Sequence, residues 1–276
     1  MRRAFNAADF PRRRRLRGVT LVEMIVVIVV SGILLSIVGM FTRNQIASYI
    51  DVANRTELAD AADTALRRMA REIQSALPNS VRPTTVGNVT VLEFVPIKDA
   101  GRYRAQKGSA GGEDLDFSAT ADTFDVLGPP VQVAAGDWLA IYNLGIPGAD
   151  VYEGSSRREL DGSGTLSSLK FKGTPFPLAS PQSRFQIVDG PVSYVCDPNQ
   201  KRLLRYSGYG FKVLQPVSAA DFGVAPAILT QDVAECSLAY AAAVLQRNGL
   251  VSMRLKLTRN GESVELLHQV DVMNSP

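Results

Sequence analysis

The chain has 276 residues, of which 46% are hydrophobic, and a formal net charge of +3. This length is enough for one large domain or two small ones. Residues 1–18 contain seven arginines and one aspartate, so residues 19–276 carry a net charge of about −3. No basic patch with interleaved aromatic residues follows, which excludes nucleic-acid binding as the main role.

Residues 18–41 form an apolar run with a single charge, Glu23, near its start. Residues 24–42 are uncharged, and a helix of about 20 residues spans a bilayer core about 30 Å thick. A secretory signal peptide is disfavoured because its apolar segment has about 7–15 residues and precedes a small-residue cleavage site. A plain signal anchor, with the arginines in the cytoplasm, leaves Glu23 unexplained, although an acid in a spanning helix is costly.

A third interpretation accounts for the pattern Gly-x-Thr-Leu-x-Glu, formed by Gly18, Thr20, Leu21 and Glu23. With Arg17 before it and Gly-Ile-Leu at residues 32–34, this pattern resembles the signal of type IV prepilins and pseudopilins. The resemblance implies that a membrane-embedded prepilin peptidase cuts between Gly18 and Val19 and methylates the new amine of Val19. It also implies that Glu23 pairs with the N-terminal ammonium of a neighbouring subunit. A carboxylate in lipid is costly unless such a cation neutralises it. The family usually has Phe where this chain has Val19, a departure that bears on the rate of processing.

The same resemblance implies the domain organisation. Residues 1–18 are the leader, residues 19–77 form one helix with a transmembrane part at about 22–42, and residues 78–276 form a β-rich periplasmic domain. The oxidising periplasm permits a disulfide between Cys196 and Cys236, the two cysteines of the chain. We favour this pairing; the alternative is two buried free thiols.

The second half of the expected helix is amphipathic. Six apolar residues recur at spacings of three and four, which predicts one buried stripe packed on the chain's own domain: Leu58, Ala62, Leu66, Met69, Ile73 and Leu77. Pro78 disfavours helix in the residue before it, so the helix is expected to end at Leu77.

Beyond Pro78 the sequence predicts strands. Strand-like segments lie at residues 88–95, 123–127, 137–142, 169–172, 184–188, 192–196 and 202–206. Residues 237–245, 251–258 and 264–272, separated by Asn-Gly turns, predict an antiparallel meander. Residues 98–122 and 145–164 are expected to be long surface loops. The predicted fold is α+β and pilin-like: a long N-terminal helix packed on an antiparallel β-sheet-rich globular domain.

Signals for chemistry are weak. The sequence has no G-x-S-x-G elbow and no phosphate-binding loop, and its only histidine, His268, lies in a strand-like segment. Clustered acids could bind calcium but lack EF-hand spacing, so a solvated loop is the simpler interpretation: Glu113, Asp114, Asp116, Asp122 and Asp125. We therefore expect no catalytic residue, no metal and no cofactor, and a protein that is not an enzyme.

A narrower resemblance covers parts of the soluble region. Residues 66–73, 76–82, 191–197 and 204–206 are similar to MshO-type minor pilins of the mannose-sensitive haemagglutinin (MSHA) type IV pilus, and the layout is shared with PilW-type minor pilins. The implied partners are prepilin peptidase, other minor and major pilins, the inner-membrane assembly platform and the lipid bilayer, with no nucleic acid. The implied role is to prime a filament and remain at its tip. The alternatives are a J-type pseudopilin of type II secretion and a membrane-anchored periplasmic enzyme or sugar-binding protein.

Overall fold

The structure is a computed structural model that describes residues 18–109, 111–117, 122–242 and 248–273. The predicted leader, apart from Gly18, lies outside the described residues, as do residues 243–245 of one predicted strand. The chain divides after Val52 into two compact units. Each unit is described separately below.

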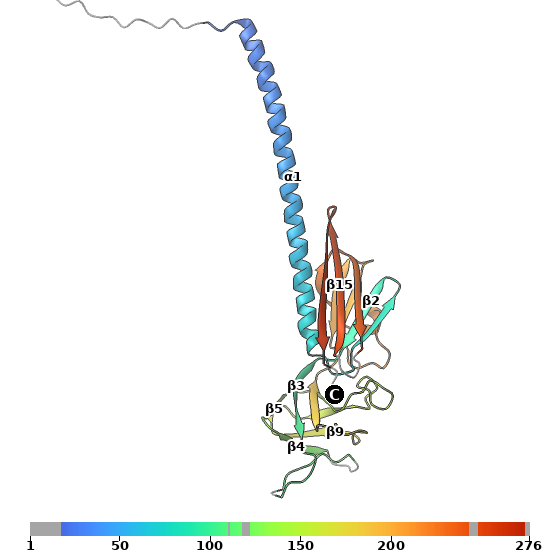
Figure 1. The fold of residues 1–276 in the computed structure, drawn as a ribbon. Coiled ribbons are helices and arrows are strands. Elements are labelled where there is room, and N and C mark those ends of the chain that lie inside the picture. Colours follow the sequence, from blue (N-terminus) through green and yellow to red (C-terminus); the bar gives the residue numbers. More distant parts are fainter. Residues whose placement is uncertain (1–17, 110, 118–121, 243–247, 274–276) are drawn as a thin grey trace, which may run out of the picture. The chain divides into compact units, whose positions relative to one another are not determined.

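The first unit is the N-terminal part of helix α1, which runs over Leu21–Gln74 (Figure 1). Its large apolar side chains are exposed from Val19 to Val52. Within the described residues, α1 is the one helix long and apolar enough to cross a membrane. The exposed apolar surface requires an apolar environment, so this helix suggests membrane anchoring.

The rest of α1 belongs to the second unit and buries the predicted stripe. Leu58, Ala62, Leu66, Met69 and Ile73 are each at most 2% exposed, which confirms the periodicity. The helix ends at Gln74, however, and not at Leu77.

The helix stops early because its last N–H groups find other partners. The N–H of Ser75 donates to the main-chain carbonyl of Glu72, and the N–H of Ala76 donates to that of Ile73. These bonds span three residues instead of four and end the helix with tighter turns. The N–H of Leu77 then donates to the carbonyl of Val95 at 2.7 Å. Leu77 therefore lies outside the helix, and Pro78 does not determine where the helix ends.

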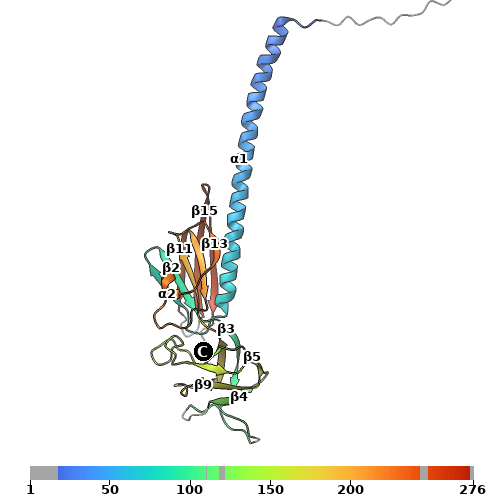
Figure 2. The same ribbon diagram turned by 180° about the vertical axis from the view of Figure 1, so that it is seen from behind.

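Two antiparallel sheets share one core with α1 (Figures 1 and 2). The five-stranded sheet has the order β1 (Arg82–Val86), β2 (Val89–Phe94), β11 (Val192–Asp197), β12 (Arg202–Ser207) and β13 (Ala227–Gln231). The three-stranded sheet is a meander of β14 (Val233–Ala241), β15 (Gly249–Arg259) and β16 (Glu262–Val272). A short helix, α2 (Ala219–Phe222), covers the other face of the five-stranded sheet through Phe222.

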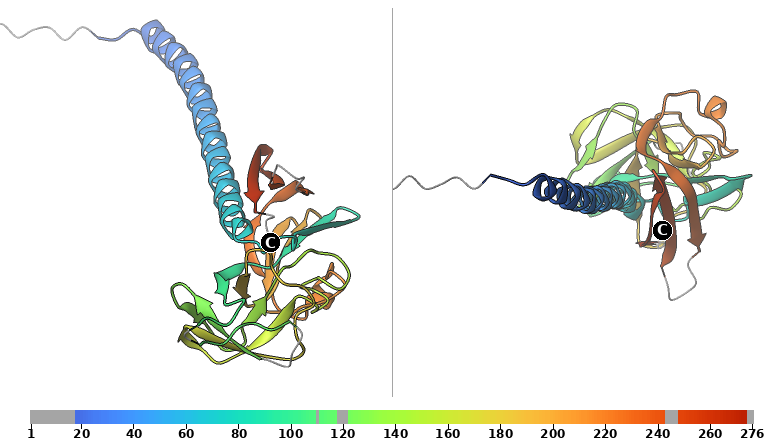
Figure 3. Two further views of the ribbon diagram at one scale, coloured as in Figure 1. Left: turned by 60° about the horizontal axis from the view of Figure 1, so that its bottom comes forward. Right: turned by 90° about the horizontal axis from the view of Figure 1, so that it is seen from above.

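Six strands of the second unit form a closed barrel. Most of these strands lie in the green to yellow part of the ribbon (Figure 3). The strand order of the barrel is β10 (Arg184–Val188), β3 (Ile97–Tyr103), β4 (Thr123–Leu127), β9 (Ser168–Lys172), β7 (Arg157–Asp161) and β6 (Trp138–Ala140). A separate pair, β5 (Val131–Val133) and β8 (Gly164–Leu166), packs against it. The barrel has its own core, which includes Phe124, Phe171 and Phe185.

The barrel is an insertion between two neighbouring strands. Phe94 at the end of β2 is the cross-strand partner of Val192 at the start of β11. Ile97 and Val188, the first and last residues of the barrel strands, are also partners. The chain thus enters and leaves the barrel at adjacent points. Because the folded barrel holds these two points together, the entropic cost of bringing β2 and β11 side by side is low.

The predicted α+β class with antiparallel sheets is confirmed. The two predicted loops are partly wrong, because residues 97–103 form β3 and residues 157–161 form β7. Both strands look polar in the sequence because most of their side chains are exposed or half-buried. In β3 a side chain is excluded at Gly101, since a Cβ there would lie 2.7 Å from the Phe185 ring.

A disulfide joins the two sheets that share the core with α1. Cys196 in β11 bonds Cys236 in β14, at a sequence separation of 40. Replacing both cysteines with alanine should lower the free energy of unfolding by about 3–4 kcal/mol, because the unfolded chain regains the entropy of an open loop. Urea unfolding of the oxidised wild type and the double variant measures this difference. Reducing agent should lower the stability of the wild type only; an equal response of the double variant would contradict the prediction.

Candidate processing and assembly site

The Gly18–Val19 bond lies in an accessible segment before α1. Residues 18–20 have no regular structure and are exposed, and Val19 is 68% exposed. A Cβ on Gly18 would meet no atom within 4 Å, and its φ is not in the left-handed region. The fold of this chain therefore does not require glycine here. A requirement for glycine must come from a molecule that binds this segment.

Thr20 caps the N-terminus of α1. Its Oγ1 accepts the N–H of Glu23 at 3.2 Å, and its carbonyl accepts the N–H of Met24 at 3.2 Å. These bonds satisfy donors that a helix start leaves free. Thr-x-x-Glu is also the sequence of a capping box, so the spacing of Thr20 and Glu23 marks the helix start independently of the prepilin resemblance. The cap places Glu23 in the first turn, where the helix dipole favours a negative charge.

Glu23 has no cationic partner inside the described part of the chain. It is exposed at the start of α1, whose residues 24–42 are uncharged and mostly apolar. A carboxylate at the edge of a bilayer is tolerated when a cation neutralises it. Such a cation would lie outside the described residues: on the arginines of residues 1–17, on the N-terminal amine of a processed chain or on another molecule.

Two hydroxyl groups in the apolar part of α1 are hydrogen-bonded within the helix. Ser36 donates its hydroxyl to the carbonyl of Gly32, and Thr42 to that of Val38, both at 2.8 Å. Such bonds remove unpaired donors, which are costly in hydrocarbon. Added Cβ atoms on Gly32 or Gly39 would meet nothing within 4 Å, so these positions offer open surface for another helix to approach.

The acidic residues considered for calcium do not form one cluster. Asp125 accepts from Arg104 at 3.3 Å, Asp122 pairs with Lys170 at 3.5 Å and Asp114 lies 4.0 Å from Lys107. Over the described ranges, no group of three His, Cys, Asp or Glu side chains could hold a metal ion. His268 lies half-buried on β16 beside α1.

Two carboxylates of the second unit are tied into hydrogen-bond networks. Glu93 is fully buried, accepts from Arg82 at 2.6 Å and from the Tyr209 hydroxyl at 2.7 Å. Burial raises the pKa of Glu93, and the nearby Arg82 only partly offsets this. The network links β1 and β2 to the loop that carries Tyr209, which is a scaffolding role.

Glu72 connects α1 to the five-stranded sheet. It accepts from Arg205 at 2.8 Å and from the Tyr194 hydroxyl at 2.7 Å. Burial would raise the pKa of Glu72, but the hydrogen bonds and charge of these partners outweigh it and hold the pKa below its usual value. Glu72 lies outside the predicted apolar stripe of α1, and the sequence pattern gives no sign of this pairing.

Residues 13–39 match the prokaryotic N-terminal methylation motif. The match includes the last arginines, the Gly18–Val19 bond, the Thr20 cap and Glu23. No curated protein and no solved structure matches the chain. The motif supports a type IV pilin-like or pseudopilin-like protein that is processed at its N-terminus, and it implies prepilin peptidase and pilin partners in general.

Proposed function

We propose that this protein is a minor type IV pilin that takes part in initiating a pilus of the MSHA kind. Prepilin peptidase cuts between Gly18 and Val19, and Val19 becomes the methylated N-terminus. Glu23 then pairs with the N-terminal ammonium of a neighbouring subunit. The observation that carries the proposal is an exposed Gly18–Val19 bond followed by the capped start of α1. The apolar run over residues 18–41 has one acid, Glu23, which lacks a cationic partner in the described chain.

The proposed role is structural and not enzymatic. After processing, residues 19–276 would be anchored in the inner membrane by the start of α1, with the globular part in the periplasm and later at the filament tip. Glu72 and Glu93 are engaged by Arg205 and Arg82, as expected of groups that hold a scaffold. The MshO-type assignment rests on the similarity of residues 66–73, 76–82, 191–197 and 204–206. The first segment lies in α1, the second follows it, the third covers β11 and the fourth lies in β12.

A minor pseudopilin of type II secretion is the second candidate, because the methylation motif fits both classes equally. A deletion separates them: loss of filaments with normal secretion supports the pilin, and loss of secretion with normal filaments supports the pseudopilin.

Glu23→Gln tests the assembly step directly. Glutamine keeps the size of the side chain and its place in the helix cap but removes the charge. We expect normal cleavage, with a methylated Val19 detected by mass spectrometry, but at least about tenfold less protein in sheared filaments, since a lost ion pair in an apolar medium is worth more than 1.4 kcal/mol. Filament incorporation at the wild-type level would contradict the proposal, as would a native polypeptide that still begins at Met1.

A further inference from the structure

β16 has an open edge. It is the last strand of the three-stranded sheet, and among the described residues no strand pairs with its outer side. Arg259 and Glu262 close the two-residue turn between β15 and β16, and such closing pairs are hydrogen-bonded. Bonded pairs then recur at every second residue, so Leu267 and Gln269 direct their main-chain groups to the open edge.

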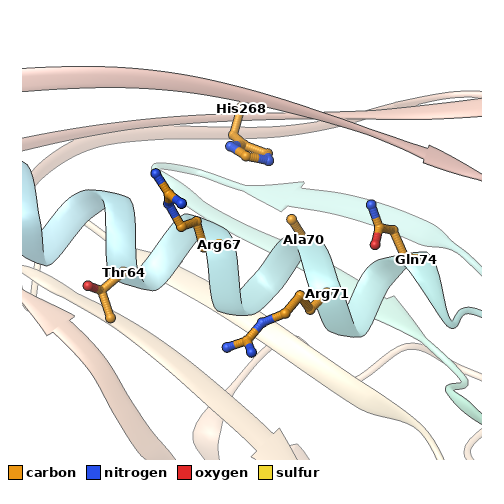
Figure 4. Close-up of a pocket in the computed structure, with 6 residues that line it drawn as sticks. All are labelled: Thr64, Arg67, Ala70, Arg71, Gln74 and His268. Atoms are coloured by element: carbon orange, nitrogen blue, oxygen red, sulfur yellow. The ribbon is translucent and has the colours of Figure 1, made fainter.

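A groove of about 540 Å³ lies between β16 and α1 (Figure 4). His268 projects from the strand toward the helix, near Arg67 and Ala70. The small side chain of Ala70 leaves the room for the groove. Its lining contains two arginines and a histidine and no acid: Thr64, Arg67, Ala70, Arg71, Gln74 and His268.

The groove carries a positive charge that the described chain does not neutralise. Arg67 is paired with Asp63 at 2.7 Å. Arg71 is exposed and has no ion pair with any described residue. An acidic group that enters the groove would therefore meet a guanidinium free to form a charge-assisted hydrogen bond.

The strand edge is held in place at one end. Arg55 pairs with Glu262 at 2.6 Å and Arg259 with Glu57 at 3.1 Å, which ties the turn of the hairpin to α1. On the opposite face of β16 from the groove, Leu267 is 66% exposed. The edge thus presents a basic face toward the helix and an apolar contact toward solvent.

We propose that β16 accepts an extended segment of a partner protein as a fourth strand, and that this segment alternates acidic and apolar residues. A strand added about 4.8 Å from β16 would lie over the groove. The residue opposite His268 would face α1 and pair with Arg71 when it is acidic. Its neighbours would face outward and pack on Leu267 when they are apolar. This inference goes beyond the proposed function. The groove is lined by residues of the second unit, so it does not depend on cleavage between Gly18 and Val19.

Binding of designed peptides to the full-length chain in detergent tests the proposal. The probes are a short fluorescent peptide of alternating valine and glutamate and a matched peptide of valine and lysine, compared by fluorescence polarisation. We expect the glutamate peptide to bind at least about tenfold more tightly, the effect of one charge-assisted pair. Amide exchange of residues 262–272 should also slow when this peptide is bound.

Three variants separate strand addition from general attraction between charges. Arg71→Glu should weaken binding of the glutamate peptide about tenfold or more. Leu267→Pro removes an N–H that points to the open edge, a position where proline is compatible with a sheet, and should abolish binding. Lys170→Glu makes the same charge change on β9 of the barrel and should leave binding unchanged.

Several results would overturn the inference. These are equal affinity for the two peptides, no binding of either, or affinity that survives Leu267→Pro. Equal losses in Arg71→Glu and Lys170→Glu would mean that overall charge, and not this groove, attracts the peptide. Because the assay uses the unprocessed chain, its failure would leave cleavage and the role of Glu23 untouched.

Discussion

Gly18→Ala is expected to leave the chain at its full length in cells that process the wild type. An added Cβ at this position meets no atom of the chain and needs no unusual φ, so the variant should fold like the wild type. Any effect must therefore arise where the peptidase holds the bond. A displacement of about 1 Å at a reacting bond slows a reaction roughly a hundredfold, so little mature protein should form.

Mass spectrometry of the N-terminus reads the outcome. Gly39→Ala is the matched control, because a Cβ there also meets nothing within 4 Å while the position lies well inside α1. It should be cut at the wild-type rate. Equal processing of Gly18→Ala and Gly39→Ala would refute cleavage at the Gly18–Val19 bond.

Arg82→Ala should lower the free energy of unfolding by about 3–5 kcal/mol, because it leaves the carboxylate of Glu93 buried without its cation. The side chain of Glu93 has no exposed area, and Arg82 lies 2.6 Å from it. Arg82 also donates to the carbonyls of Val213 and Lys212 and stacks over the Tyr152 ring at 3.5 Å. Urea unfolding measures the loss.

The pH dependence of this variant has a defined sign. The folded-state pKa of Glu93 is raised, so protonation favours the folded state, and the stability it gives is lost as pH rises through that pKa. Without Arg82 the pKa rises further, and the deficit should be larger at neutral pH than at acidic pH.

The double variant Arg82→Ala, Glu93→Gln is the control for this interpretation, because it removes the buried charge. It should recover part of the lost stability at neutral pH. A double variant as unstable as Arg82→Ala at every pH would mean that packing by Arg82, and not the charge of Glu93, causes the effect.

Local signals in the sequence predicted the parts of the fold that depend on short-range order. The spacing of Leu58, Ala62 and Met69 marks the buried face of α1, because a helix repeats every 3.6 residues. Asn260 and Gly261 mark the β15–β16 turn, because both adopt positive φ. The cap at the start of α1 was not predicted, although the spacing of Thr20 and Glu23 is that of a capping box.

Features that join distant segments were not predictable in this way. The barrel closes through β10, which pairs with both β3 and β6. The alternation of apolar and polar residues within one strand does not show which strands it pairs with. β1 was missed because it is short, contains Pro83 and is largely exposed. The pairing of Arg82 with Glu93 depends on the register of β1 and β2, and the groove at Arg71 depends on α1 lying beside β16.

The adjacent entry and exit of the barrel have a consequence for how this architecture diversifies. Because Phe94 and Val192 remain direct neighbours in the sheet, a tight hairpin turn could replace everything between them without a shift in register. Modules of other sizes could be exchanged at the same junction, while the hydrophobic contacts of α1 with its sheets stay constant. Surface properties of such a protein can therefore change independently of the helix that anchors it.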